Sequence, residues 1–370
     1  MKSYIVGGWV RDRLLEREGR TVSRGGDRDW VVVGATVAEM LAQGYTPVGR
    51  DFPVFLHPQT HEEYALARTE RKSAPGYRGF VVHAAPEVTL EEDLQRRDLT
   101  INALALDDQE RLIDPCGGLD DLRKRVLRHV GPAFVEDPVR ILRLARFAAR
   151  FPEFSIAPQT LALARAMVAA GEAAALVPER VWQELVRGMQ EERPSRMLEV
   201  LADTTLLAQV APELHPSPAL GAALDRAAHE GAPLAVRVAV LASSAQSGAA
   251  LRALLERLRA DNESAQLARL LYDVRAELRV ATTVADLAGV LERTDAMRRP
   301  QRFAQLLQAA ALIDPIPLER LRKAAAAASA VDAGAIAAQA GPDPTAIAQA
   351  ITSARRAAIA RALESTPGAT

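Results

Sequence analysis

Hydrophobic and polar positions follow two different patterns along the chain. In the first part, short apolar runs at residues 3–6, 30–33 and 54–56 are rich in β-branched and aromatic side chains, which predicts strands. Helical patterns lie between these runs, over residues 37–43 and 90–94. We therefore expect an N-terminal unit that mixes strands and helices, of the α/β or α+β class.

The pattern changes at about Asp137. From there on, Leu, Ala and Arg recur at three- and four-residue spacing, which predicts helices over residues 138–151, 158–170, 178–189 and 195–207. The remainder of the chain is expected to be all helical. Its last part contains a run of five alanines and few large side chains, so we expect thin helices packed on a neighbour, or partial mobility.

Composition and charge restrict the class of protein. With 370 residues, the chain is too long for one ordinary core, so two or three packed units are expected. Apolar residues make up 49% and charged residues 25%, which is typical of soluble globular proteins and excludes global disorder. The 46 basic and 47 acidic residues leave a net charge of -1, so any nucleic-acid binding must depend on a local basic patch.

Cysteine content and the N-terminal sequence bear on location. The single cysteine, Cys116, excludes an internal disulfide scaffold and a thiolate zinc cluster, and it favours a reducing compartment. Residues 1–12 reach charged residues and glycine after few apolar ones, so no signal peptide is predicted. No run of 18 apolar residues follows. We expect a cytoplasmic protein that does not associate with membranes.

Two segments near the N-terminus carry candidate chemistry. In YIVGGWVRD, residues 4–12, a strand runs into a glycine pair and a helix start, so backbone N–H groups can approach an anion and Arg11 can reach back to it. In DRDWVVV, residues 27–33, Asp27 and Asp29 lie two apart at the head of a strand, which points both carboxylates to the same side. Oxygen ligands at that spacing suit Mg²⁺. Each feature also occurs without function in turns and at strand ends.

Two further motifs follow in order. Residues 94–103 read LQRRDLTINA, and residues 136–147 read EDPVRILRLARF, with arginines at three-residue steps along one helical stripe. Standing alone, they could be a capped helix start and a solvated arginine face. Together with the N-terminal segments they resemble the class II tRNA nucleotidyltransferases, the CCA-adding enzymes of the polymerase β superfamily. The resemblance covers roughly residues 1–210, and more weakly the helices to about residue 310.

This resemblance implies a fold and an activity. The fold is α+β, with a polymerase β-like nucleotidyltransferase head followed by all-helical parts. The expected division is a catalytic head at 1–136, a neck carrying the base template at 137–210, a body at 211–318 and an Ala-rich tail at 319–370. The implied activity is addition of C, C and A to the 3′ end of tRNA from CTP and ATP, without a nucleic-acid template and with release of pyrophosphate.

The resemblance also implies catalytic residues. Asp27 and Asp29 would hold two Mg²⁺ ions, and Glu63 matches the third carboxylate on the next strand, with Glu62 and Glu70 nearby. Asp137 and Arg140 are carried over as the protein template for the base. A carboxylate and a guanidinium together offer acceptor and donor edges, and both cytosine and adenine show an amino donor beside a ring acceptor.

The nucleotide-binding residues implied by the resemblance form a longer set. Arg97 is expected to contact the nucleotide because its planar fork can hold phosphate oxygens or ribose hydroxyls, with Asp98 fixing the ribose or its neighbour. Arg143 and Arg146 are expected to face the phosphates. The full set comprises Gly8, Arg11, Arg97, Asp98, Asp137, Arg140, Arg143 and Arg146. Transfer RNA is expected along a basic strip, for which the candidates are Lys124, Arg125, Arg293, Arg298, Arg299 and Arg302.

The sequence departs from the family in its C-terminal half. Bacterial members carry an HD domain, a metal phosphohydrolase whose signature is a helical His-Asp pair. Here Ser243 and Ser244 stand in those places, and after residue 200 only His215 and His229 remain. Since serine is a poor metal ligand, we expect a degenerate remnant without phosphohydrolase activity.

Three alternatives stay open. A bacterial poly(A) polymerase shares the head but usually has a long basic C-terminal extension, whereas this chain ends in alanine-rich sequence. A split enzyme would add only CC or only A. A non-catalytic RNA-binding scaffold is the alternative from another class, and incorporation of labelled nucleotide separates it from the enzymes. The oligomeric state is not indicated.

Overall fold

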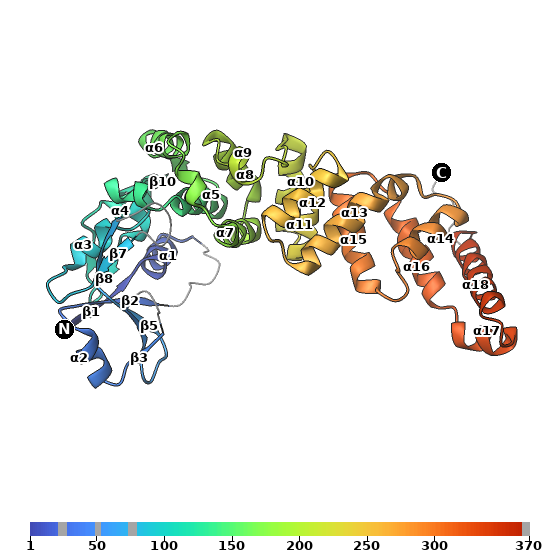
Figure 1. The fold of residues 1–370 in the computed structure, drawn as a ribbon, viewed down its shortest axis with the longest axis horizontal. Coiled ribbons are helices and arrows are strands. Elements are labelled where there is room, and N and C mark those ends of the chain that lie inside the picture. Colours follow the sequence, from blue (N-terminus) through green and yellow to red (C-terminus); the bar gives the residue numbers. More distant parts are fainter. Residues whose placement is uncertain (21–27, 49–52, 73–79, 365–370) are drawn as a thin grey trace. The chain divides into compact units, whose positions relative to one another are not determined.

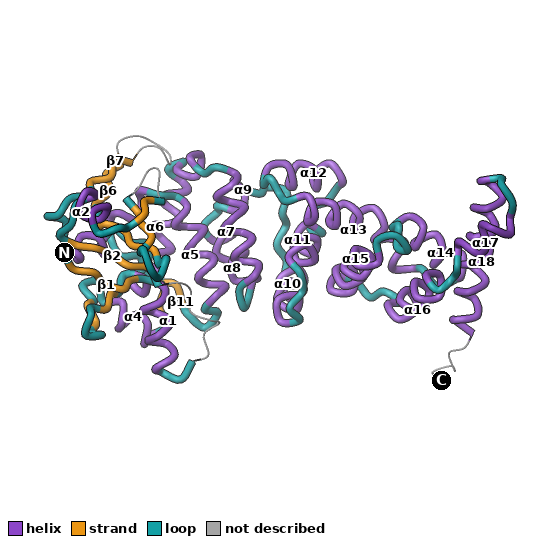
Figure 2. Tube along the Cα trace, turned by 90° about the horizontal axis from the view of Figure 1, so that it is seen from below, coloured by secondary structure: helices purple, strands orange, loops and turns teal. Residues whose placement is uncertain are grey.

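The structure is a computed structural model that describes residues 1–20, 28–48, 53–72 and 80–364. The chain divides into two compact units: Met1–Gly188 with Arg196–Val210, and Met189–Ser195 with Ala211–Thr370. Figures 1 and 2 show that the strands of the described residues all belong to the first unit, whereas the second unit consists of helices and their connections. The prediction of an α+β head followed by helical parts is confirmed.

The first unit is built on a seven-stranded mixed sheet. Neighbouring strands are antiparallel, except β2 and β5, which run parallel. A separate antiparallel pair is formed by β6 (Thr69–Lys72) and β7 (Phe80–His83). The strands of the main sheet, in spatial order, are β3 (Thr46–Pro47), β4 (Val54–Leu56), β5 (Glu63–Leu66), β2 (Asp29–Val33), β1 (Lys2–Val6), β8 (Ala105–Leu106) and β9 (Leu112–Ile113).

Both faces of this sheet are buried. Since side chains alternate along a strand, Val31 of β2 packs with Val6 and Leu94 on one face, while Val32 packs with Met40 and Phe55 on the other. The β-branched run of β2 therefore lies at the centre of the sheet with helices on each side.

The helices of the first unit begin and end at residues that sequence rules favour. Helices α2 and α3 each begin with a capping box, Thr36 with Glu39 and Thr89 with Glu92. Proline opens α6, and α7 begins at a proline as well. The helices are α1 (Gly8–Arg17), α2 (Val37–Ala42), α3 (Leu90–Gln95), α4 (Gly118–Lys124), α5 (Val139–Arg150), α6 (Pro158–Ala169), α7 (Pro178–Gln190), α8 (Pro194–Asp203) and α9 (Leu207–Val210).

Three sequence predictions need correction. The part after Asp137 is not all helical, because the two-residue strand β11 (Ser155–Ile156) pairs in parallel with β10 (Val126–Leu127). The helix predicted over 195–207 ends at Asp203, where Thr205 adopts a positive φ of 59°. The RRD motif does not open an apolar helix but lies between α3 and a 3-10 turn at Thr100–Asn102.

The second unit is a stack of helices. Helix α11 packs on α13 and α15, and in the alanine-rich tail α18 packs on α16, α17 and α14. Ser243 and Ser244 follow α11, and their hydroxyls donate to the carbonyls of Val240 and Leu241. The helices are α10 (Pro218–His229), α11 (Leu234–Ala242), α12 (Gly248–Arg257), α13 (Asn262–Val280), α14 (Val284–Arg293), α15 (Pro300–Ile313), α16 (Leu318–Ser329), α17 (Ala333–Ala340) and α18 (Pro344–Glu364).

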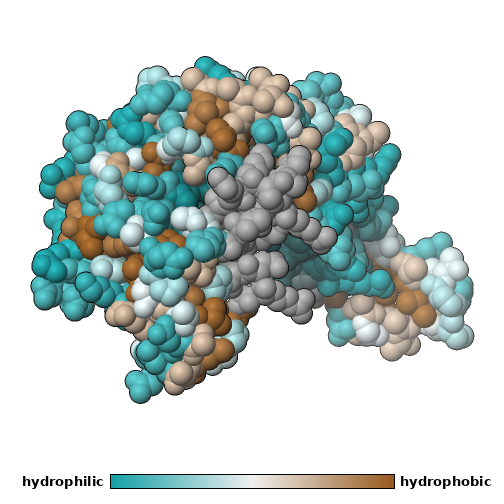
Figure 3. All heavy atoms as spheres, turned by 60° about the vertical axis from the view of Figure 1, so that its left-hand side comes forward, coloured by the Kyte–Doolittle hydropathy of each residue, from teal (hydrophilic) through white to brown (hydrophobic). Residues whose placement is uncertain are grey.

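The surface and the helix lengths agree with the composition. Hydrophilic side chains cover much of the face seen in Figure 3, with smaller apolar areas between them. In the part of the chain that the structure describes, no helix combines the length and apolar character needed to cross a membrane.

Candidate active site

The site begins at one edge of the main sheet. The register pairs Val6 at the end of β1 with Asp29 at the start of β2, and pairs Asp29 in turn with Glu63 at the start of β5. The glycine pair that follows Val6 therefore lies at the same edge as two carboxylates. Because register partners point to the same face of a sheet, Asp29 and Glu63 share a face.

Gly7 makes the turn from strand to helix possible. Its φ of 75° lies in the left-handed region, and its N–H donates to the carbonyl of Leu104 at 3.0 Å. A Cβ at this position would lie 2.9 Å from Nη1 of Arg97. The backbone therefore favours glycine here, and a side chain at this position would also displace the end of Arg97, a predicted nucleotide-binding residue.

A cavity of about 570 Å³ opens at this edge. Nine arginines and three aspartates line it, which leaves a large excess of positive charge for an anionic ligand. The lining residues are Gly7, Gly8, Arg11, Asp29, Arg68, Arg96, Arg97, Asp98, Asn102, Asp137, Arg140, Arg143, Arg146, Phe147, Arg150 and Arg180.

Arg11 is buried in this wall. Its guanidinium donates to Asp12 at 2.8 Å and to Oδ1 of Asn102 at 2.5 Å, and it lies over the rings of Phe147 and Phe151. Burial lowers the pKa of Arg11 to about 10, against the opposing charge of Asp12. Asp12 also accepts from Arg150 at 2.8 Å. In this structure the Arg11 guanidinium is held by protein groups and lies beside the Gly7-Gly8 turn, where a Cβ at Gly8 would be 3.5 Å from its Nη2.

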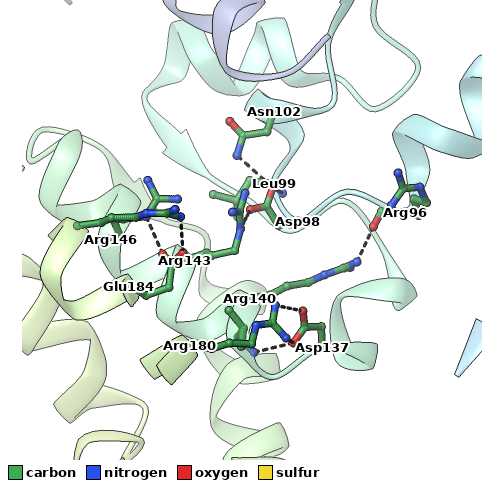
Figure 4. Close-up of polar contacts among 12 residues, drawn as sticks. Arg96, Asp98, Leu99, Asn102, Asp137, Arg140, Arg143, Arg146, Arg180 and Glu184 are labelled. Carbon is green, nitrogen blue, oxygen red and sulfur yellow. Dashed lines mark hydrogen bonds and ion pairs between the residues drawn. The ribbon is translucent and has the colours of Figure 1, made fainter. Parts of the chain in front are cut away.

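The buried carboxylate of Asp98 accepts three hydrogen bonds. One carboxylate oxygen accepts from the Leu99 N–H at 2.8 Å and from Asn102 Nδ2 at 3.0 Å, and the other accepts from Arg143 Nε at 2.7 Å (Figure 4). Burial alone would raise the pKa of Asp98, but the charge of Arg143 and these hydrogen bonds outweigh it and hold the pKa well below its usual range. Asp98 raises the pKa of Arg143 in return. The carboxylate thus holds Arg143, a pairing that the sequence did not predict, and the expected contact of Asp98 with the ribose stays a prediction.

The predicted template residues have different partners. Asp137 accepts from Arg180 Nη2 at 3.0 Å and from the Val139 N–H at 3.0 Å. Arg140 donates to the main-chain carbonyl of Ala133 at 2.7 Å. It also donates to the main-chain carbonyl of Arg96 at 2.7 Å (Figure 4). Arg180, which pairs with Asp137, thus comes from α7, and Arg140 ties the start of α5 to the loop of the RRD motif.

A second contact from α7 supports the arginine stripe. Arg146 Nε donates to Glu184 at 2.7 Å, and Arg187 donates to the other oxygen of Glu184 at 3.3 Å. Arg146 also lies 4.6 Å from the ring centroid of Phe147. Glu184 is buried, so it holds Arg146 in one orientation against the cavity wall.

The structure brings most of the predicted residues together. Gly8, Arg11, Asp29, Arg97, Asp98, Asp137, Arg140, Arg143 and Arg146 all line the cavity. Glu63 is exposed at the start of β5 and is not among the lining residues, although it is the register partner of Asp29. Asp27 lies outside the described residues. Within them, no cluster of three or more His, Cys, Asp or Glu suitable for a metal is found.

Sequence reasoning missed Arg68, Arg150 and Arg180. Arg180 did carry a local signal. It lies in the first turn of α7, where a positive charge opposes the helix dipole, which indicates an acidic partner nearby. Arg150 follows Arg146 by four residues, so it extends the arginine stripe of α5 by one further turn.

Several predicted tRNA contacts have intramolecular partners. Lys124 pairs with Asp120, Arg293 with Glu277 and Arg299 with Asp295. Arg302 donates to the carbonyl of Thr294. These side chains remain predictions as RNA contacts.

Comparisons with known proteins show which family the chain resembles. Residues 3–128 match the family model described as "Poly A polymerase head domain", and residues 153–217 match "Probable RNA and SrmB- binding site of polymerase A". The chain is 55% identical over 359 residues to the "CCA-adding enzyme" of Bordetella pertussis, covering 97% of this chain and 96% of that protein. It is 49% identical over 415 residues to the "Multifunctional CCA protein" of Burkholderia orbicola, covering 98% and 99%.

Solved structures share the fold. "Thermotoga maritima CCA-adding enzyme complexed with tRNA_CCA" has a TM-score of 0.67 at 20% identity and covers 99% of this chain and 92% of that one. "The complex structure of CCA-adding enzyme with CTP" has a TM-score of 0.68 at 20% identity and covers 98% and 90%. From the identity and coverage of its curated relatives, the chain belongs to the family of class II CCA-adding tRNA nucleotidyltransferases.

Proposed function

We propose that this chain adds C, C and A in turn to the 3′ end of tRNA, from CTP and ATP, and releases pyrophosphate. The observation that carries the proposal is the cavity of the first unit, where an excess of arginines surrounds Asp29, Asp98 and Asp137. A nucleoside triphosphate matches this charge, and full-length relatives named for CCA addition support the choice of reaction.

The carboxylates at the sheet edge fit a divalent cation. Asp29 lines the cavity and Glu63 is its register partner, and hard oxygen donors are the ligands that Mg²⁺ prefers. We propose that Asp27 and Asp29 hold two Mg²⁺ ions, with Glu63 assisting. When bound, the metal would supply activation of the 3′ hydroxyl and neutralisation of the pyrophosphate charge.

The chain's own side chains would bind and orient the nucleotide. We propose that Arg97, Arg143 and Arg146 contact the triphosphate, because guanidinium groups pair with phosphate oxygens in two-point contacts. Asp98 and Glu184 would keep two of these arginines in place. Asp137 and Arg140 together would form the protein template for the base. Asp137 would accept a hydrogen bond from the amino group of cytosine or adenine, and the guanidinium of Arg140 would offer donors to the base edge.

The remaining sequence-based assignments are part of the same proposal. They comprise the head, neck, body and tail divisions at 1–136, 137–210, 211–318 and 319–370, and tRNA binding through phosphates and overall shape. They also include a remnant without phosphohydrolase activity around Ser243, and a cytoplasmic location. An assay for phosphatase and 2′,3′-cyclic phosphodiesterase activity with Ni²⁺ or Mn²⁺ tests the remnant, and robust turnover would refute it.

Primer extension tests the function. Purified protein and Mg²⁺ are incubated with tRNA transcripts lacking CCA, CA or A, with CTP and ATP supplied separately and together, and products are sized to one nucleotide. We expect extension that stops at CCA. Asp27→Ala and Asp29→Ala are expected to abolish extension while tRNA binding persists, because the carboxylates act on the reaction and not on the RNA.

Each other outcome identifies an alternative. A long ladder of A would indicate a poly(A) polymerase, and addition of CC or A alone would indicate a split enzyme. The absence of incorporation would indicate a scaffold. Extension by the two aspartate variants at the wild-type rate would contradict the metal assignment.

A further inference from the structure

Arg180 contacts the carboxylate that reads the base in the proposed function. Its Nη2 donates to Asp137 Oδ2 at 3.0 Å, and its Nη1 lies 3.4 Å from Oδ1 (Figure 4). Arg180 lies in α7 and Asp137 in the short link before α5, 43 positions apart in sequence. Both side chains are partly exposed, at 28% for Arg180 and 23% for Asp137, and both line the cavity.

These contacts determine how many further hydrogen bonds the Asp137 carboxylate can accept. A carboxylate has about four lone-pair positions over its two oxygens. Oδ1 accepts from the Val139 N–H and from Arg180, and Oδ2 accepts from Arg180. This arrangement leaves room for one more donor, on Oδ2. A single amino group, as on cytosine or adenine, meets that requirement, whereas uracil and guanine present a carbonyl oxygen at the same position.

We propose that Arg180 is a specificity-determining residue, which selects CTP and ATP over UTP and GTP by holding the Asp137 carboxylate in one orientation. This inference rests on the proposed function. Without Arg180, the Val139 N–H would hold only one oxygen, and the carboxylate could turn about its Cβ–Cγ bond. A carboxylate in other orientations would then discriminate less between the amino group of cytosine or adenine and the carbonyl oxygen of uracil or guanine.

Helix α7 supplies matched control residues. Arg187 is an arginine on the same helix that pairs with Glu184 and does not line the cavity. Glu184 lies one turn from Arg180 and holds Arg146, a proposed phosphate contact. Removal of Glu184 should weaken the binding of CTP, ATP, UTP and GTP alike, since all four carry the same triphosphate.

The first test is the ratio of kcat/KM for CTP against UTP on tRNA lacking CCA. For Arg180→Ala we expect the ratio to fall by about tenfold to a hundredfold, the worth of an oriented hydrogen bond to a charged group. Arg180→Lys should restore part of the ratio, because it keeps the charge without the planar fork. Arg187→Ala should keep the wild-type ratio, and Glu184→Gln should lower kcat/KM for both nucleotides while the ratio is kept.

The second test shows whether Arg180 acts through Asp137. In an Asp137→Ala background, Arg180→Ala should cause no further loss of selectivity, because the group it orients is absent. An additive loss, or an unchanged ratio in Arg180→Ala alone, would overturn the proposal. A fall in the thermal midpoint with an unchanged ratio would also overturn it and assign Arg180 a purely structural role.

Equilibrium binding keeps this inference separate from the proposed function. Titration of CTP and UTP into the wild-type protein and into Arg180→Ala, without tRNA, needs no transfer step. If wild type prefers CTP and Arg180→Ala does not, the inference is supported even where extension fails. If both proteins bind the two nucleotides equally while wild type still builds CCA, the inference is wrong and the proposed function stands.

Discussion

Replacement of Asp98 by Asn tests the electrostatics of the cavity wall. Asp98→Asn keeps the shape of the side chain, so the carbonyl oxygen can still accept from Leu99 and Asn102. The new NH₂ group would then face Nε of Arg143, which removes a hydrogen bond of 2.7 Å and places two donors against each other.

The expected cost follows from burial. A hydrogen bond to a charged partner contributes about 1.5–3 kcal/mol. Asp98 is 6% exposed, but the Arg143 side chain is 36% exposed and water can replace part of the contact. We therefore expect the free energy of unfolding to fall by about 2 kcal/mol at pH 7.

The pH dependence gives the sign of the effect. Because the pKa of Asp98 lies below its usual range in the folded protein, its stabilisation is present above the pKa of an unfolded carboxyl group and is lost as the pH falls through the folded pKa. The difference between wild type and Asp98→Asn should thus narrow when the pH is lowered from 7 to about 3.5.

Urea unfolding followed by tryptophan fluorescence measures both quantities. Trp9, Trp30 and Trp182 all belong to the first unit, so the signal reports on the unit that contains Asp98. Asp120→Asn is the control, because Asp120 pairs with Lys124 on the surface, and its unfolding midpoint should hardly change. The reasoning would be refuted if Asp98→Asn lowered the free energy of unfolding by less than about 0.5 kcal/mol at pH 7. It would also be refuted if wild type and Asp98→Asn differed in this free energy by the same amount at both pH values.

Three further predictions concern the same unit. Gly7→Ala should lower the free energy of unfolding by at least about 1–2 kcal/mol and weaken CTP binding, measured by urea unfolding and titration, because it adds backbone strain and a contact with Arg97. Gly19→Ala shares the positive φ but has open space, so an equal loss of CTP affinity there would contradict the role of that contact. Asp12→Asn should lower the free energy of unfolding by about 3–5 kcal/mol in the same assay, since it leaves the positive charges of Arg11 and Arg150 close together without the carboxylate that they share. Glu110→Gln, which removes an exposed acid shared by Arg13 and Arg17, should have little effect, and similar losses for both would argue against burial as the cause. Arg140→Gln should accelerate amide hydrogen exchange at Arg97 and Phe134, because both flank the carbonyls that Arg140 holds, and unchanged exchange would show that the tether does not stabilise this loop.

The parts of the fold that were predictable are those with local signals. The β-branched run of β2, the glycine turn after β1 and the capping boxes each act within a few residues, and their elements were placed closely. Strand β11 was not predicted because two residues carry too little pattern, and its pairing with β10 depends on contact between segments 29 positions apart.

The same distinction applies to the site. The arginine stripe of α5 was visible as a three-residue spacing, but the acids that hold it were not. Glu184 meets Arg146 from 38 positions away, and Asp98 meets Arg143 across 45 positions. Such pairs depend on how α7 and the RRD loop pack against α5, which no local pattern specifies. The partners of Arg11 were not predicted for the same reason, because its contact with Asn102 forms only in the folded unit.

The acceptors of Arg140 have a consequence for the tolerance of this site to mutation. Both are main-chain carbonyls, of Ala133 and Arg96, and every amino acid supplies such a carbonyl. Side chains at these two positions can therefore drift during evolution without loss of the tether. Of the residues in these two hydrogen bonds, only Arg140 must keep its side chain. Substitutions at Ala133 or Arg96 leave the acceptors in place, whereas a substitution at Arg140 removes the donor of both hydrogen bonds.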